Sequence, residues 1–361
     1  MQKIKYLSVC LVILMISGAA RAQSSVTLYG QIDVALLFTN KTINPATGQS
    51  SGKQFSLTSG GNLPSYFGIK GSEDLGGGFF VNFNLQSGIS AVNGGFDDTN
   101  GNLFGRQAWL GLSGNFGETK VGVQYSPFLL AQVEIDARGS GLFGSAANFY
   151  GDEEFTGFFV SNALSYTSPN IYGFTGSVMY ALGGIAGDFS AGKSYSASLK
   201  YEYKGLLVDA AIEDEANSVA LNTAPLTVPL EARELGAAYN FGKVTIKASF
   251  TSYNAPLSLD DNIRSGGANN VYSTGYDYLI TPQVDLNGAV YFAKDPNDAK
   301  SHALSVAQGA QYFLSRTTTL YAQLDVVNNS GTENIGSSFD SALSGVHGTT
   351  IAANIGMRHD F

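Results

Sequence analysis

The sequence predicts an all-β protein, a closed antiparallel transmembrane β-barrel of about sixteen strands with short turns at one end and long loops at the other. Three observations predict it: the composition, a hydropathy period of two, and connections that alternate in length. Of 361 residues, 44 are Gly, 12% are aromatic and only 14% are charged, yet the mean hydropathy is +0.03. Soluble proteins carry about 25% charged residues. Few charges at neutral hydropathy indicate alternating polar and apolar side chains.

The first 22 residues have the pattern of a cleaved secretory signal peptide. Lys3 and Lys5 precede an apolar stretch over 7–16, and Ala20-Arg21-Ala22 provides the small residues of a cleavage site before Gln23. Cleavage removes three basic residues, so the net charge falls from −9 to −12, and it removes Cys10, the one cysteine. We therefore expect residues 23–361 to form one barrel domain without disulfides, and the acidic balance excludes nucleic acid as a partner.

A period of two runs through the mature chain, which contains no apolar run long enough for a membrane helix. In 195–204, 244–250, 320–326 and 351–361, alternate residues are apolar and every charged residue falls on the opposite face. The apolar face is rich in Ala, Gly and Tyr, which suits lipid contact better than a sandwich core. A strand-built membrane protein must close, because an open edge leaves backbone groups unpaired in hydrocarbon.

The connections between these segments alternate between short and long, as in outer-membrane barrels. The expected short turns are 75–78, 114–117, 169–170, 204–205, 241–243 and 315–317. The expected long loops are 40–61, 127–161, 183–193, 216–232, 254–270 and 328–348.

Seven stretches, in order from the first strand to the last, resemble the general trimeric porins of the Gram-negative outer membrane, in their β-proteobacterial branch. They are Val26-Thr-Leu-Tyr-Gly30, residues 67–78 (FGIKGSEDLGGG), residues 104–114 (FGRQAWLGLSG), Gln124-Tyr-Ser-Pro127, Ser165-Tyr-Thr-Ser-Pro169, Leu314-Ser-Arg-Thr317 and Gly356-Met-Arg-His-Asp-Phe361.

The resemblance implies a homotrimer of sixteen-stranded barrels, each with a water-filled pore for passive diffusion of small hydrophilic solutes and ions. It implies contact with outer-membrane lipid and lipopolysaccharide. It also implies that the loop at 127–161 folds inward as the constriction, and that Phe361 is read by the outer-membrane assembly machinery. An aromatic girdle is a second role for Phe361, compatible with the first.

In porins of this family, basic residues on the wall face carboxylates on the inward loop. The loop half is present as Glu134 and Asp136, moderated by Arg138, with a further acidic group at 152–154. A solvated acidic loop outside the barrel is the alternative for these residues.

On the barrel wall, most of the basic residues that the family carries are missing. Arg106 and Lys70 match basic residues of the family, whereas Tyr66, Val123 and Gln31 stand where relatives carry Arg or Lys. The match places Val123 inward, although strand alternation also allows it to face lipid. An inward Arg106 would bring Leu110 and Leu112 inward unless a bulge intervenes.

Alternation places three bases and eight acids on the inner face of the clearer strands, and this excess predicts a preference for cations. The bases are Lys200, Lys247 and Arg358, and the acids are Asp33, Glu202, Asp209, Glu213, Asp277, Asp285, Asp325 and Asp360.

Other functional hypotheses have less support from the same sequence. A barrel enzyme would need a site built on His302, His347 or His359, and no nucleophile-elbow pattern accompanies them. A sugar-specific channel would need an ordered aromatic track, and the candidate inward aromatics follow no evident order: Tyr29, Tyr66, Tyr291 and Tyr321. A surface adhesin or antigen is a further alternative. We expect no cofactor and no zinc site, while Ca²⁺ or Mg²⁺ on the acidic loops stays open.

Overall fold

The computed structural model describes residues 25–44, 46–98, 101–153, 158–215, 230–255, 267–339 and 342–361. The predicted leader at 1–22 and most of the loops at 216–232 and 254–270 lie outside these ranges. The described chain forms one antiparallel sheet of seventeen strands that closes on itself, because β1 (Ser25–Ile43) pairs with β19 (Gly348–Asp360). The short β17 (Ile335–Ser338) and β18 (Ala342–Ser344) form a separate pair.

The barrel wall has sixteen strand positions, as predicted, and each position is called a stave below. Seventeen strands fill sixteen staves because two consecutive strands form one interrupted stave. β2 (Ser50–Ser59) and β3 (Tyr66–Gly76) pair with successive parts of β1. The others are β4 (Phe79–Gly88), β5 (Gln107–Gly114), β6 (Gly117–Gln124), β7 (Val160–Thr167), β8 (Phe174–Ala181), β9 (Ser194–Tyr203), β10 (Leu206–Glu215), β11 (Leu230–Asn240), β12 (Val244–Ala255), β13 (Gly267–Thr281), β14 (Val284–Lys294), β15 (His302–Phe313) and β16 (Thr318–Ser330).

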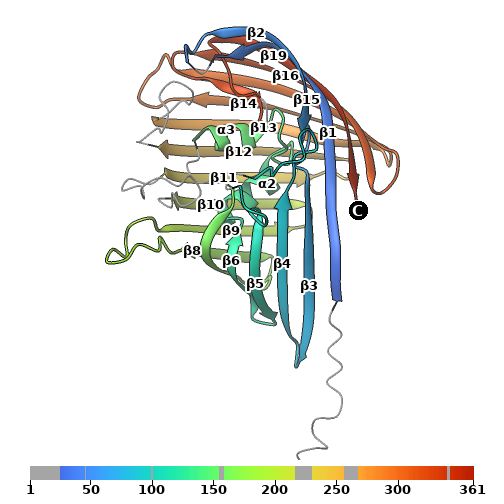
Figure 1. Cartoon of the computed structure of the whole chain (residues 1–361), viewed down its shortest axis with the longest axis vertical. Coiled ribbons are helices and arrows are strands. Elements are labelled where there is room, and N and C mark those ends of the chain that lie inside the picture. Colours follow the sequence, from blue (N-terminus) through green and yellow to red (C-terminus); the bar gives the residue numbers. More distant parts are fainter. Residues whose placement is uncertain are drawn as a thin grey trace, which may run out of the picture.

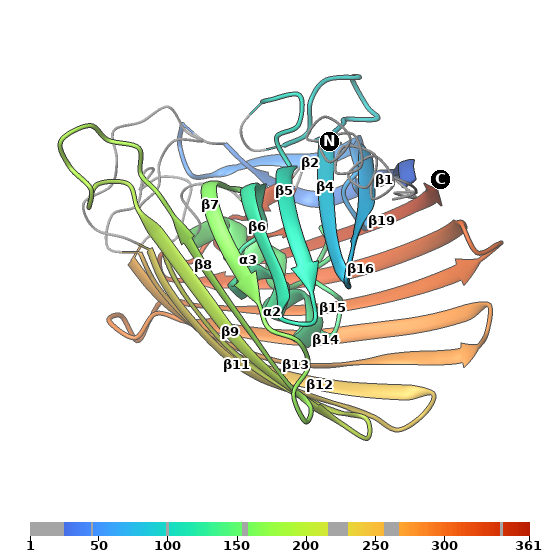
Figure 2. The same cartoon turned by 90° about the horizontal axis from the view of Figure 1, so that it is seen from below.

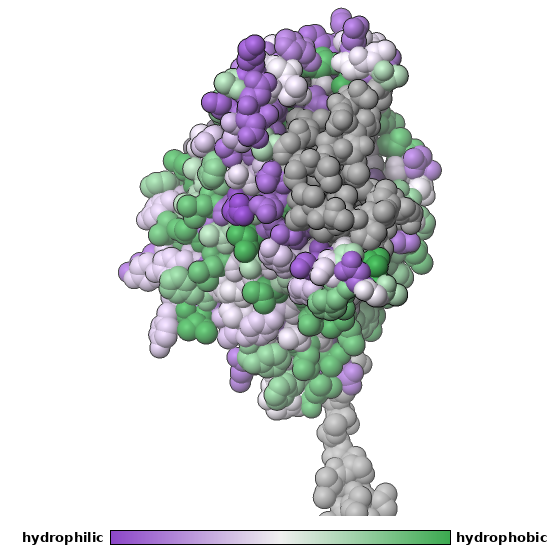
Figure 3. Space-filling view, turned by 90° about the vertical axis from the view of Figure 1, so that its left-hand side faces the viewer, coloured by the Kyte–Doolittle hydropathy of each residue, from purple (hydrophilic) through white to green (hydrophobic). Residues whose placement is uncertain are grey.

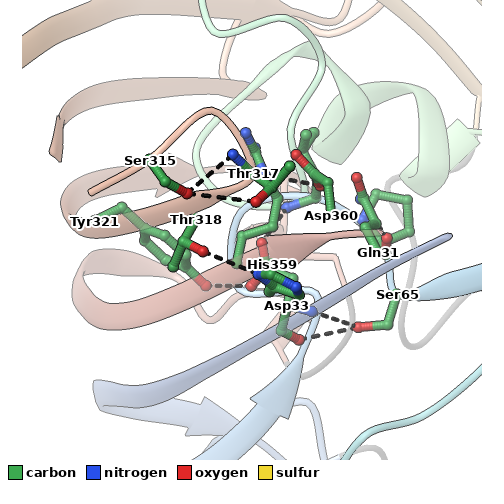
Figure 4. A network of polar contacts seen from close by, with 12 residues as sticks. Gln31, Asp33, Ser65, Ser315, Thr317, Thr318, Tyr321, His359 and Asp360 are labelled. Atoms are coloured by element: carbon green, nitrogen blue, oxygen red, sulfur yellow. Dashed lines mark hydrogen bonds and ion pairs between the residues drawn. The ribbon is translucent and has the colours of Figure 1, made fainter. Parts of the chain in front are cut away.

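Polar contacts reinforce the place where the barrel closes (Figure 4). The Tyr321 hydroxyl of β16 donates to the Asp33 carboxylate of β1 across β19. The Ser65 hydroxyl accepts from the Asp33 backbone N–H at 2.9 Å, and Thr318 contacts His359 Nδ1 at 2.9 Å. The first bond joins β1 to β16, the second joins β1 to the break between β2 and β3, and the third joins β16 to β19.

Alternation separates an apolar outer face from a polar inner one. On β15, Leu304 and Val306 are exposed outward, whereas Ala303 and Ser305 are buried inside. The end view in Figure 3 shows hydrophobic side chains gathered over its lower part and hydrophilic ones over its upper part. The registers place all eleven charged residues assigned inward from the sequence on the inner face.

Two sequence expectations about the wall are wrong. The loop expected at 40–61 is mostly strand, because β1 runs to Ile43 and β2 begins at Ser50. Val123 pairs with Ala108 on the outer face, because it alternates in step with Val121, which is exposed on that face opposite Leu110.

Arg106 precedes β5, so its inward position coexists with outward Leu110 and Leu112 without a bulge inside the strand. The six predicted short turns fall between strands. Among the described helices, none is both long and apolar enough to span a membrane.

Candidate functional site

Two helices in the chain between β6 and β7 lie inside the barrel (Figures 1 and 2). They are α2 (Pro127–Ile135) and α3 (Ala146–Glu153). The Ser126 hydroxyl caps α2 by accepting from the Leu129 N–H at 3.1 Å, and Pro127 occupies the first turn, where its missing N–H costs nothing. α2 lies against β9, β10 and β11, while α3 lies against β17 and β18.

Glycines on alternate strands provide the space for this inward segment. A Cβ at Gly236 on β11 would lie 2.1 Å from Cγ2 of Ile135, and one at Gly275 on β13 would lie 2.6 Å from Cβ of Ala137. A Cβ at Gly309 on β15 would lie 2.8 Å from Nη1 of Arg138. The end of α2 therefore lies directly on the backbone of the wall.

Arg138 fastens the segment to the barrel wall at β14 and β16. Its Nη1 donates to Asn287 Oδ1 at 2.6 Å, its Nη2 donates to Gln323 Oε1, and both Nε and Nη2 reach the Phe143 carbonyl. The predicted moderating base is thus a bridge from the segment to β14 and β16.

Asp136 is buried where α2 ends. Its carboxylate accepts from the Tyr291 hydroxyl at 2.5 Å and from the Ser140 N–H at 2.6 Å. Burial raises the pKa of Asp136, and these two hydrogen bonds oppose the rise. Lys247 donates to the backbone carbonyls of Glu134 and Asp136, the negative end of the α2 dipole.

Glu134 is exposed inside the barrel and pairs with Lys200 of β9 at 3.0 Å. In the acidic group at 152–154, the side chains of Asp152 and Glu153 and the whole of Glu154 lie outside what the structure describes. Of the described charges on the loop, Glu134 therefore forms an ion pair with Lys200, whereas Asp136 and Arg138 are held by hydrogen bonds to uncharged partners.

Along the wall of β1 and β3 to β6, three bases stack on aromatic rings. Arg106 lies over Tyr66, with its guanidinium carbon 5.2 Å from the ring centre, and over Phe159 at 4.9 Å. Lys70 lies 4.7 Å above Tyr29. The pair Lys120 and Trp109, which the sequence reasoning missed, repeats the pattern at 4.7 Å. The alternation of β5 and β6, which directs Trp109 and Lys120 into the barrel, could have identified this pair from the sequence.

The remaining candidates lie at the closure or under the segment. Asp325 is buried and accepts from Ser305 at 2.8 Å. Phe361 follows β19, exposed, and exchanges backbone hydrogen bonds with Gly30. Tyr291 and Tyr321 are buried with carboxylate partners, so they form no aromatic track along the pore. In the described ranges no three His, Cys, Asp or Glu side chains cluster as metal ligands would.

Comparison with known proteins identifies the barrel. The profile of the Gram-negative porin family matches residues 8–332. The chain is a Gram-negative porin. This porin is 28% identical to outer membrane porin protein 32 of Delftia acidovorans, over 98% of this chain and 99% of the relative. It is 24% identical to the major outer membrane protein P.IB of Neisseria gonorrhoeae, over 82% and 87%.

Solved structures agree on the fold. An anion-selective porin from Comamonas acidovorans superposes with a TM-score of 0.77 at 24% identity, covering 94% of this chain and all of that one. OmpT of Vibrio cholerae gives 0.65 at 15% identity, over 95% and 99%. The porin is therefore an outer-membrane channel and not an enzyme.

Proposed function

We propose that this porin is a general diffusion channel for small hydrophilic solutes and ions, with residues 127–161 as its constriction. The observation that carries the proposal is the attachment of this segment to the inner wall through Arg138, Asp136 and the contact at Gly236. A polar lumen narrowed by a fixed segment selects by size and charge.

The cation preference expected from the sequence lacks support, because five of the eight inward acids do not reach the water-filled path. Asp33, Asp209, Glu213, Asp285 and Asp325 are each no more than 5% exposed. The partly exposed acids that remain, Glu202, Asp277 and Asp360, equal in number Lys200, Lys247 and Arg358. The Comamonas relative is described as anion-selective, which also gives cation preference no support.

We therefore propose weak ion selectivity. Planar-bilayer recordings in a KCl gradient test it: we expect cation and anion permeabilities within about threefold of each other, which corresponds to less than about 0.7 kcal/mol. A permeability ratio above about ten in either direction would overturn the balanced count. A purified chain that conducts no ions would overturn the channel itself.

Assembly and export complete the proposal. A homotrimer is supported by the V. cholerae OmpT, which was solved in a trimer form. The leader at 1–22 and the assembly role of Phe361 follow from the sequence pattern. Cross-linking of the purified porin tests the trimer, and N-terminal sequencing of the mature protein tests cleavage before Gln23.

A further inference from the structure

A cavity of about 400 Å³ opens beside the inward segment. Its walls come from the break between β2 and β3, the connection between β4 and β5, the segment between β6 and β7, and Phe339. Most of its lining side chains are apolar or aromatic: Leu63, Leu129, Leu130, Val133, Leu142, Phe158, Phe159 and Phe339. An apolar pocket in an otherwise polar lumen is the form of a small-molecule site.

α2 presents apolar side chains to this cavity instead of burying them. The helix packs on the wall through Phe128 and Ile135, both buried, whereas Leu130 is 49% and Val133 39% exposed. Three residues apart, Leu130 and Val133 lie on one face of the helix. They leave apolar surface exposed inside the channel, and such surface marks a place for an apolar ligand.

Opposite charges lie at one end of the cavity. Arg106 lines it, donates from Nε to Gln86 at 2.9 Å and from Nη2 to Tyr125 at 2.8 Å, and within the described ranges has no carboxylate at ion-pair distance. Asp97 and Asp98 also line it. Arg106 and Asp97 flank Gly88, where a Cβ would lie 2.1 Å from the Asp97 carbonyl oxygen and 3.2 Å from Cδ of Arg106.

We propose that this cavity is a binding subsite for zwitterions with a large apolar side chain, namely hydrophobic α-amino acids. The carboxylate pairs with Arg106, the ammonium with Asp97, and the apolar side chain covers Leu130 and Val133. An anion alone would pair with Arg106 and face the carboxylates of Asp97 and Asp98, and a cation alone would leave Arg106 without a counter-charge. The subsite rests on the proposed channel, which supplies the path to it.

The test is block of single-channel current by L-phenylalanine. Three probes each lack one part of it: 3-phenylpropanoate lacks the ammonium, phenethylamine lacks the carboxylate, and L-serine lacks the ring. We expect phenylalanine to bind about tenfold tighter than each probe, the change that about 1.4 kcal/mol produces. Equal block by phenylalanine and 3-phenylpropanoate would overturn the proposal in favour of a carboxylate site.

Charge variants separate binding from folding. Asp97→Asn should weaken phenylalanine block severalfold and leave 3-phenylpropanoate block no weaker, while Arg106→Gln should weaken both and spare phenethylamine. Loss of a merely structural contact would move all the probes together, and that result would overturn the assignment.

The apolar contact has its own matched pair. Leu130→Ser should weaken phenylalanine block severalfold relative to L-serine. Leu103→Ser, at an exposed leucine of the connection that carries Asp97 and outside the cavity lining, should change neither block nor conductance. A wild-type chain that conducts ions yet shows no preference for phenylalanine over the three probes would defeat the subsite alone, whereas a wild-type chain without conductance would defeat the channel.

Discussion

The lumen wall has two halves that treat inward charges differently. On β9 to β16 the inward segment covers much of the wall, and acids such as Asp209 and Asp325 are buried beneath or beside it. On β1 and β3 to β6 the bases stand over aromatic rings, as Lys70 does over Tyr29. Both halves consist of strands in which inward and outward side chains alternate in the same way. An inward side chain therefore contributes to the pore field only where no segment of the chain lies over it.

The attachment of the inward segment should give the largest effect. Arg138→Ala removes the hydrogen bonds to Asn287, Gln323 and the Phe143 carbonyl, and bonds from a charged donor are each worth about 1.5–3 kcal/mol. We expect a noisier channel with higher mean conductance in single-channel recordings. Conductance and noise equal to wild type would show that the segment does not depend on Arg138 for its position over β9 to β16.

The glycine contact should give the next effect. Gly236→Ala places a methyl group against Ile135, and overpacking of this kind costs about 1–3 kcal/mol. We expect a lower urea midpoint and an altered conductance. Gly176→Ala on β8 is the matched control, since a Cβ there meets nothing within 4 Å. Equal effects of the two variants would contradict a tight seat for α2.

Charge changes in the two halves test the comparison directly. Lys70→Glu, on the open wall, should shift the reversal potential toward cations, with a permeability ratio changed severalfold, about 1 kcal/mol. Asp325→Asn, on the covered wall, should leave the reversal potential unchanged. A larger shift for Asp325→Asn would mean that the covered acids do reach the pore water.

A pH dependence should give the smallest effect. Burial raises the pKa of Asp136 above its ordinary value of 3.8. The folded state therefore binds a proton more readily than the unfolded state, so this residue makes the fold more stable as pH falls through the raised pKa and less stable as pH rises. Urea midpoints at pH 4 and pH 7, compared with those of Asp136→Asn, measure the difference. A wild-type midpoint that gains nothing on acidification relative to the variant contradicts it.

Local alternation carried most of the fold and part of the site. It placed Lys200, Lys247 and Arg358 inside, and it allowed the outward position of Val123, which the family match had placed inward. Burial of the inward acids depends on contacts such as the hydrogen bond from Tyr150 to Glu213, 63 positions apart, which no local pattern contains. The predicted preference for cations lacks support for this reason. The sequence gives the number of inward charges, whereas the electric field in the pore depends on which of these charges are exposed to water.

The break between β2 and β3 ties the wall to what lies inside it. A continuous strand directs its carbonyls sideways to its neighbours. At the break, the Gly61 carbonyl instead accepts from the side chains of Gln323 and Asn354, and the Asn62 carbonyl accepts from the Leu142 N–H at 2.8 Å. Insertions or deletions at 60–65 would therefore change the shape of the pore as well as the barrel wall. At this stretch, evolution or engineering could change the width of the pore while the other strands of the barrel stay as they are.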